Sequence, residues 1–69
     1  MPAANPFNWQ DEAAKLWRRI GPGSVLEIYD KHCIISAGQV RMAYIPFEFD
    51  GDEKTIAVMA EQFVNKAKR

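Results

Sequence analysis

The sequence contains a single cysteine, Cys33, and no run approaching the roughly 20 apolar residues that a membrane-spanning helix requires. One cysteine cannot form an internal disulfide, and unpaired cysteines are normal in reducing compartments. The N-terminal region carries its acids before its arginines, which is the reverse of a secretory signal. These features predict a cytoplasmic protein with no membrane span and no disulfide framework.

The charges show no excess of either sign, because nine Lys plus Arg balance nine Asp plus Glu. A balanced chain has no long-range attraction for nucleic acid or for anionic lipid. A length of 69 residues, with 48% hydrophobic and 26% charged residues, is typical of one small globular domain. We therefore expect a single domain over residues 1–69, with no repeat and no dividing linker.

Two segments have the pattern of amphipathic helices. In the first, predicted from Trp9 to Ile20, apolar residues recur every three or four positions, Asn8 provides a cap, and Gly21-Pro22-Gly23 ends the helix. The second begins after Asp50-Gly51-Asp52-Glu53, where Asp50 and Glu53 have the separation of a capping box. Its predicted buried stripe is Ile56, Met59, Ala60, Phe63 and Ala67.

The region between the helices, residues 24–49, is rich in β-branched and aromatic residues, with turn signals at Asp30-Lys31 and Ala37-Gly38-Gln39. It predicts a three-stranded antiparallel meander whose last strand lies at an edge or bends at Pro46. The fold class is therefore α+β, in the order α-β-β-β-α, with both helices on one face of the sheet. Alternation assigns to the core face Leu26, Ile28, Cys33, Ile35, Val40, Met42 and Tyr44.

The opposite face of this meander is also largely apolar, and two short helices cannot cover both faces. Its residues are Val25, Glu27, Tyr29, Ile34, Ser36, Arg41, Ala43 and Ile45. Apolar residues clustered on adjacent strands favour an interface over ordinary surface. We predict that the partner or dimer interface contains Val25, Tyr29, Ile34, Ile45, Arg41 and Phe47. Charges placed at Ile34 or Ile45 should weaken association, whereas Ile28→Asp should unfold the domain.

No group of side chains indicates catalysis, a cofactor or a metal. His32 and Cys33 are neighbours on a strand, so they point to opposite faces and cannot act as a nucleophile and its base. One Cys and one His also leave a zinc site short of ligands. The acids around Asp52 lack the spacing of a calcium loop and fit helix capping instead. We expect a protein that is not an enzyme.

Basic residues at the helix ends offer an alternative, nucleic-acid contact, through Lys15, Arg18, Arg19, Lys66, Lys68 and Arg69. Helix dipoles alone also explain cations at these positions. The order helix, three strands, helix resembles the topology of double-stranded RNA-binding domains. In that family, lysines at the start of the second helix contact phosphates, whereas this sequence has Asp52-Glu53-Lys54 there. The resemblance is therefore one of topology only.

The function predicted from the sequence is a small interaction protein, an adaptor or inhibitor that forms a homodimer and binds another protein. Symmetric dimers are the commonest oligomers, and an open sheet face or edge strand supplies a self-complementary patch. Phages and mobile elements often encode short accessory proteins of this profile, so a host protein is one expected partner.

Overall fold

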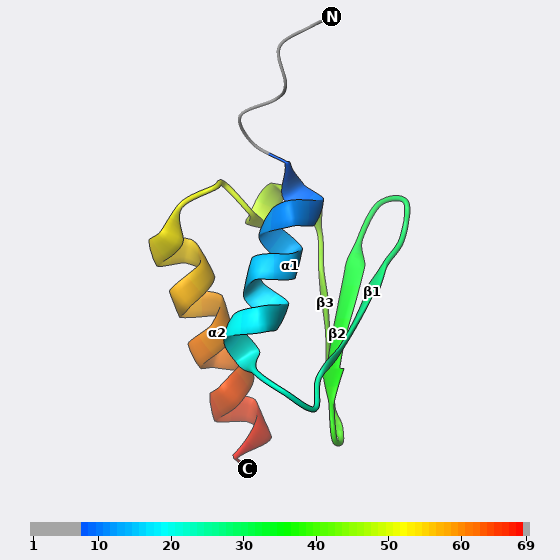
Figure 1. The fold of residues 1–69 in the computed structure, drawn as a ribbon, viewed down its shortest axis with the longest axis vertical. Helices are drawn as coiled ribbons and strands as arrows, with labels where there is room; N and C mark the ends of the chain where they lie inside the picture. The colour runs from blue at the N-terminus through cyan, green and yellow to red at the C-terminus, as the bar shows by residue number, and fades with distance from the viewer. Residues whose placement is uncertain (1–7, 69) are drawn as a thin grey trace, which may run out of the picture.

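The computed structural model describes residues 8–68, which form two helices and a three-stranded antiparallel sheet (Figure 1). This arrangement confirms the predicted α+β class and its α-β-β-β-α order. The elements in chain order are α1 (Trp9–Ile20), β1 (Val25–Ile28), β2 (Cys33–Ala37), β3 (Val40–Tyr44), the 3-10 helix η1 (Pro46–Glu48) and α2 (Glu53–Ala67).

Helix α1 has the predicted bounds and the predicted cap. The side-chain oxygen of Asn8 accepts hydrogen bonds from the backbone N–H groups of Gln10 at 2.9 Å and Asp11 at 3.4 Å. These bonds satisfy two donors that have no partner within the helix. The helix ends at Gly21, whose φ of 113° is a conformation that favours glycine.

Helix α2 begins differently from the prediction, because Asp52 and not Asp50 is its N-cap. The Asp52 carboxylate accepts from the Lys54 N–H at 3.1 Å. Asp50 instead accepts from the Asp52 N–H at 3.0 Å, and this bond, followed by one from Thr55, lowers the pKa of the Asp50 carboxyl. The capping-box prediction was wrong because Gly51, at φ 83°, turns the chain before the helix starts.

The sheet has the order β1-β2-β3, so β1 and β3 are both outer strands. Leu26 pairs with Ile35, and Ile35 pairs with Met42, which places these three side chains on one face. Both helices lie on that face and leave the other face uncovered (Figure 1). The predicted core face is therefore confirmed.

The core lies between this face and the two helices. Leu16 from α1, Ile35 from β2 and Phe63 from α2 are almost completely buried. Phe49 also enters the core, because η1 turns the chain at Pro46; its ring lies 6.0 Å from that of Tyr44 and 6.3 Å from that of Trp9. Aromatic side chains thereby join β3 to the start of α1.

The helices cover the core face unevenly. They pack more extensively against each other than either does against a strand. Ile28, on the core face at the end of outer strand β1, consequently remains 43% exposed. A charge at Ile28 would therefore remain in contact with water, so the burial on which the expected unfolding by Ile28→Asp rested is not found. Alternation fixes which face a side chain takes, but helix position decides whether that side chain is covered.

Candidate functional site

The uncovered side of the sheet, called the open face below, carries the residues that alternation assigned to it. They are Val25, Glu27, Tyr29, Ile34, Ser36, Arg41, Ala43 and Ile45. Val25 is 56% exposed, Tyr29 47% and Ile45 40%, whereas Ile34 on the central strand is half-buried. The structure thus brings five of the six predicted interface residues, these three with Ile34 and Arg41, onto one surface.

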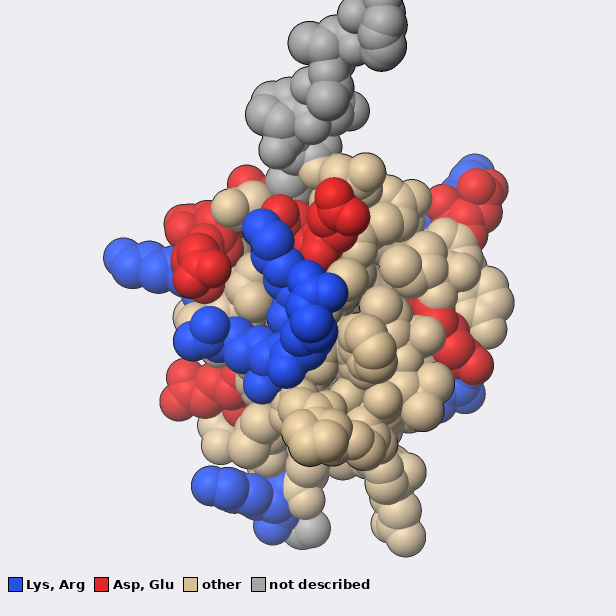
Figure 2. Space-filling model, viewed as in Figure 1, with Lys and Arg blue, Asp and Glu red and all other residues tan. Residues whose placement is uncertain are grey.

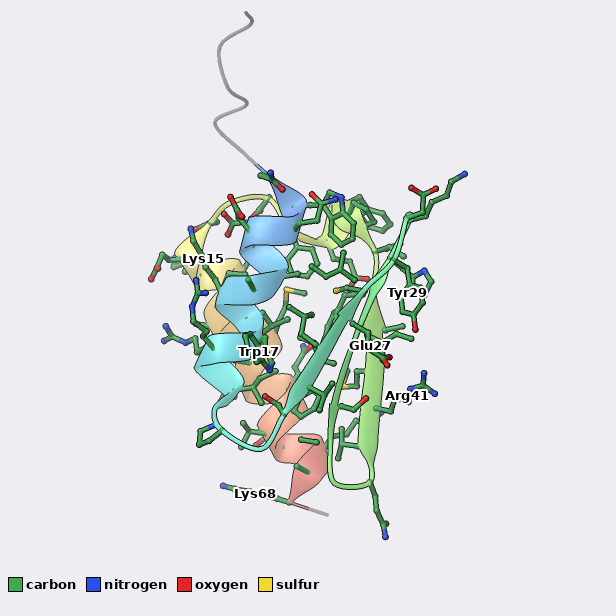
Figure 3. The ribbon with its side chains drawn as sticks, turned by 45° about the vertical axis from the view of Figure 1, so that its right-hand side comes forward. Lys15, Trp17, Glu27, Tyr29, Arg41 and Lys68 are labelled. Carbon is green, nitrogen blue, oxygen red and sulfur yellow. The ribbon has the colours of Figure 1, made fainter. Side chains whose placement is uncertain are left out.

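A charged pair crosses the middle of the open face. Glu27 on β1 and Arg41 on β3 reach over β2, so that the Arg41 Nη2 lies 3.9 Å from the Glu27 Oε1. Figure 3 shows both side chains projecting away from the helices. The two side chains are 46% and 65% exposed, and pairs this exposed contribute little to stability.

The hairpin between β1 and β2 adds an aromatic element to the open face. The rings of Tyr29 and His32 are stacked, with centroids 4.8 Å apart and an interplanar angle of 2°. The Tyr29 hydroxyl donates to the Glu27 carboxylate at 3.5 Å, which links the stack to the charged pair. His32 was not among the residues predicted on this surface. His32 lies two positions before Ile34, and this spacing was the sequence signal that could have placed His32 on the open face.

Phe47, also predicted at the interface, lies beyond the sheet on η1. It is 82% exposed. The turn that presents it is fixed by two hydrogen bonds at 3.0 Å, from the Ile45 N–H to the Glu48 carboxylate and from the Glu48 N–H to the Ile45 carbonyl. Ile45 and Phe47 are therefore both exposed apolar residues at and beyond the end of β3.

His32 and Cys33 do not form a reactive pair. Cys33 points into the core and is fully buried, and burial is the main cause that raises the pKa of its thiol to about 11. A protonated, buried thiol is a poor nucleophile. Among residues 8–68, no three His, Cys, Asp or Glu side chains form a group suited to a metal ion.

The basic residues of the alternative prediction lie on the helices. Figure 1 shows α1 and α2 running in the same direction, which brings Arg18, Arg19, Lys66 and Lys68 toward one end of the molecule. Lys15 forms a salt bridge with the buried Glu12, in which the Lys15 Nζ lies 3.2 Å from the Glu12 Oε2. Figure 2 shows Lys and Arg side chains over α1 with acidic side chains among them. Arg69 lies outside the described residues.

The start of α2 is acidic, since the Asp52 carboxylate caps the helix and Glu53 is its first residue. No helix in the described part of the chain has both the length and the apolar character needed to cross a bilayer. The chain matches no protein-family model, no curated protein and no solved structure.

Proposed function

We propose that this protein is a non-enzymatic interaction module, an adaptor or inhibitor, that forms a symmetric dimer and binds another protein. The observation that carries the proposal is the open face, whose Val25, Tyr29 and Ile45 are each at least 40% exposed. Burying apolar surface contributes about 25 cal/mol per Å². A surface of this kind is stabilised when another surface covers it.

The arrangement of charge on the open face favours a second copy as its occupant. Consider a two-fold axis that runs parallel to β2 between two stacked open faces. This axis places β1 of one copy over β3 of the other, so each Glu27 faces the strand that carries the other copy's Arg41. The acid and the base are then complementary across the interface, while the apolar residues around them are buried.

A reducing compartment such as the cytoplasm suits the buried, unpaired Cys33. The partner of the dimer is a second protein, for which a host protein contacted by a phage or mobile-element product is one candidate. In this proposal the dimer acts by covering part of that partner's surface. No step of covalent chemistry is involved.

The open face is tested by placing charges on it. Ile34→Asp and Ile45→Glu should each weaken self-association at least tenfold, equivalent to about 1.4 kcal/mol, because each leaves a charge inside the apolar contact. Helical content should remain nearly unchanged, because neither side chain belongs to the core cluster. Sedimentation equilibrium measures the association constant, and circular dichroism measures the helical content.

The matched control is Val64→Glu, since Val64 is 37% exposed and lies on α2, which is not part of the open face. It should leave the association constant unchanged. A protein that is monomeric at about 100 μM, well above the dissociation constants of stable dimers, would contradict the dimer. Equal weakening by all three variants would show that the open face is not the interface.

Nucleic-acid binding is the second candidate function, and the gathering of Arg18, Arg19, Lys66 and Lys68 toward one end of the molecule favours it. Binding by this route releases counterions from phosphates, so four contacts should reduce the affinity by about 100-fold when salt rises from 50 to 200 mM. Fluorescence anisotropy with a labelled duplex at these two salt concentrations measures this dependence. No binding at the lower salt concentration would eliminate this candidate.

A further inference from the structure

A second surface lies on the helix side of the sheet, between β3 and α2. A solvent-open hollow of about 560 Å³ separates the β2–β3 hairpin from the end of α2, and a hollow of about 380 Å³ adjoins it along α2. Both are lined by Met42 and Lys66. We call them together the β3–α2 groove. Its sheet side includes Ala37, Val40 and Met42, and its helix side includes Gln62, Asn65 and Lys66.

The groove runs beside a strand edge that has unpaired backbone groups. The Tyr29 N–H donates to the His32 carbonyl at 2.8 Å, which sets the alternation of hydrogen bonds across the sheet. Residues 32, 34 and 36 face β1, so residues 33, 35 and 37 face β3 and bond to residues 44, 42 and 40. The backbone N–H and C=O groups of Arg41 and Ala43 therefore point outward, away from β2.

We infer that the outer edge of β3 and the β3–α2 groove bind an extended acidic segment of a partner protein, which adds to the sheet as a fourth strand. Main-chain hydrogen bonds to Arg41 and Ala43 provide affinity without regard to sequence. Alternate side chains of the added strand then enter the groove beside Met42, and the others lie on the side of the open face. The groove therefore selects side chains spaced two residues apart.

Charge identifies the occupant as acidic. Lys66 lies on the helix side of the added strand, and Arg41 lies on the side of the open face. The lining residues of both hollows include no carboxylate. Acidic side chains on the helix side of the added strand thus meet Lys66, and those on the side of the open face meet Arg41, which they share with Glu27 at 3.9 Å.

The same charges argue against a second copy of this chain in the groove. Two β3 strands paired about a two-fold axis would place the Arg41 and Lys66 of both copies along one seam, where like charges repel. An acidic partner relieves that repulsion.

This inference rests on the partner-binding part of the proposed function, and it names the segment that is bound. It uses the outer edge of β3 and the β3–α2 groove, whereas the proposed dimer uses the open face. Arg41 and Ala43 take part in both, but Lys66 belongs to the groove alone and Ile34 to the open face alone. The two sites are therefore tested by separate variants. Failure of one does not imply failure of the other.

The test is a titration of the full chain with the capped peptide Val-Glu-Val-Glu-Val-Glu, followed by amide chemical shifts in two-dimensional NMR. Shift changes are expected at residues 40–44 and 62–66. Ala43→Pro, which removes an outward N–H, should abolish binding, whereas Ala43→Ser should retain it. Lys66→Glu should weaken binding about fivefold, and it should strengthen binding of Val-Lys-Val-Lys-Val-Lys. Lys68→Glu is the matched control, because Lys68 does not line the groove.

Three results would overturn the inference. One is equal binding of the two peptides by the unmodified protein, which would show that charge does not select the occupant. Another is a set of shift changes confined to open-face residues such as Val25 and Ile34. The third is a concentration-dependent shift of residues 40–44 without peptide, which would show that a second copy occupies the edge. If Ala43→Pro fails to fold, the charge exchange at Lys66 still decides, since an unchanged peptide preference in Lys66→Glu contradicts the site.

Discussion

Ile35→Asp is expected to unfold the protein. Ile35 lies on the central strand, and its side chain is completely buried between the sheet and the helices. The substitution removes a buried aliphatic side chain, which costs about 2–5 kcal/mol. It also places a carboxylate among the apolar side chains of the core. A domain of this size has a total stability of only about 3–5 kcal/mol. Circular dichroism and NMR amide dispersion should both report an unfolded chain at 25 °C.

Two neighbouring substitutions provide the controls for Ile35→Asp. Ile34→Asp places the same charge one residue earlier on the open face and should leave a folded protein. Ile28→Asp should cost an intermediate amount, about 1–2 kcal/mol, because Ile28 is 43% exposed at the end of an outer strand. A folded Ile35→Asp variant, or unfolding by Ile34→Asp to the same extent, would show that the two sheet faces have been assigned in reverse.

Raising the pH above 9 is expected to destabilise the protein through two buried groups. Burial, followed by the charge of Glu48, raises the pKa of Cys33 from 9.0 to about 11 and that of Tyr44 from 10.0 to about 12. Both groups are neutral when protonated, so the fold favours the protonated forms. Their contribution to the free energy of unfolding is fully present below pH 9. It is lost between pH 9 and 12, where the unfolded chain releases these protons before the folded protein does.

The loss amounts to as much as 1.36 kcal/mol per pH unit for each group, or about 2–4 kcal/mol in total at pH 11. Urea unfolding at half-unit steps from pH 8 to pH 11 measures this decline. Cys33→Ala removes one of the two groups, and it should delay the onset of the decline to about pH 10. A stability that stays constant from pH 8.5 to 10.5 would contradict the burial of the thiol.

Local sequence patterns predicted the elements well where a single physical signal determined them. The bounds of α1 followed from the periodicity of its apolar residues and from its cap and stop residues, Asn8 and Gly21. The faces of the sheet followed from alternation, which has a period of two whatever covers the sheet. At α2 two acids competed for the cap, and sequence spacing alone selected the wrong one. Gly51 determined the outcome, because the turn at its positive φ leaves Asp52 next to the first helical turn.

The candidate sites depended more on tertiary arrangement. Alternation grouped Val25, Tyr29, Ile34 and Ile45, but the stacking of His32 on Tyr29 required the two strands of a hairpin to meet. The contact between Glu27 and Arg41 spans three strands, so no local pattern reveals it. The β3–α2 groove joins residues 37–42 to residues 62–67, and it exists because α2 packs more on α1 than on β3.

The sequence by itself determined the order of the two helices and three strands, the side of the sheet on which each strand residue lies, and the presence of more apolar β surface than two helices can cover. These properties follow from short-range sterics and from the periods of helix and strand. Only the tertiary structure decided which apolar residues remain exposed and where the groove forms. Exposure depends on how two rigid helices share contact between each other and the sheet, and that balance involves residues far apart in the chain.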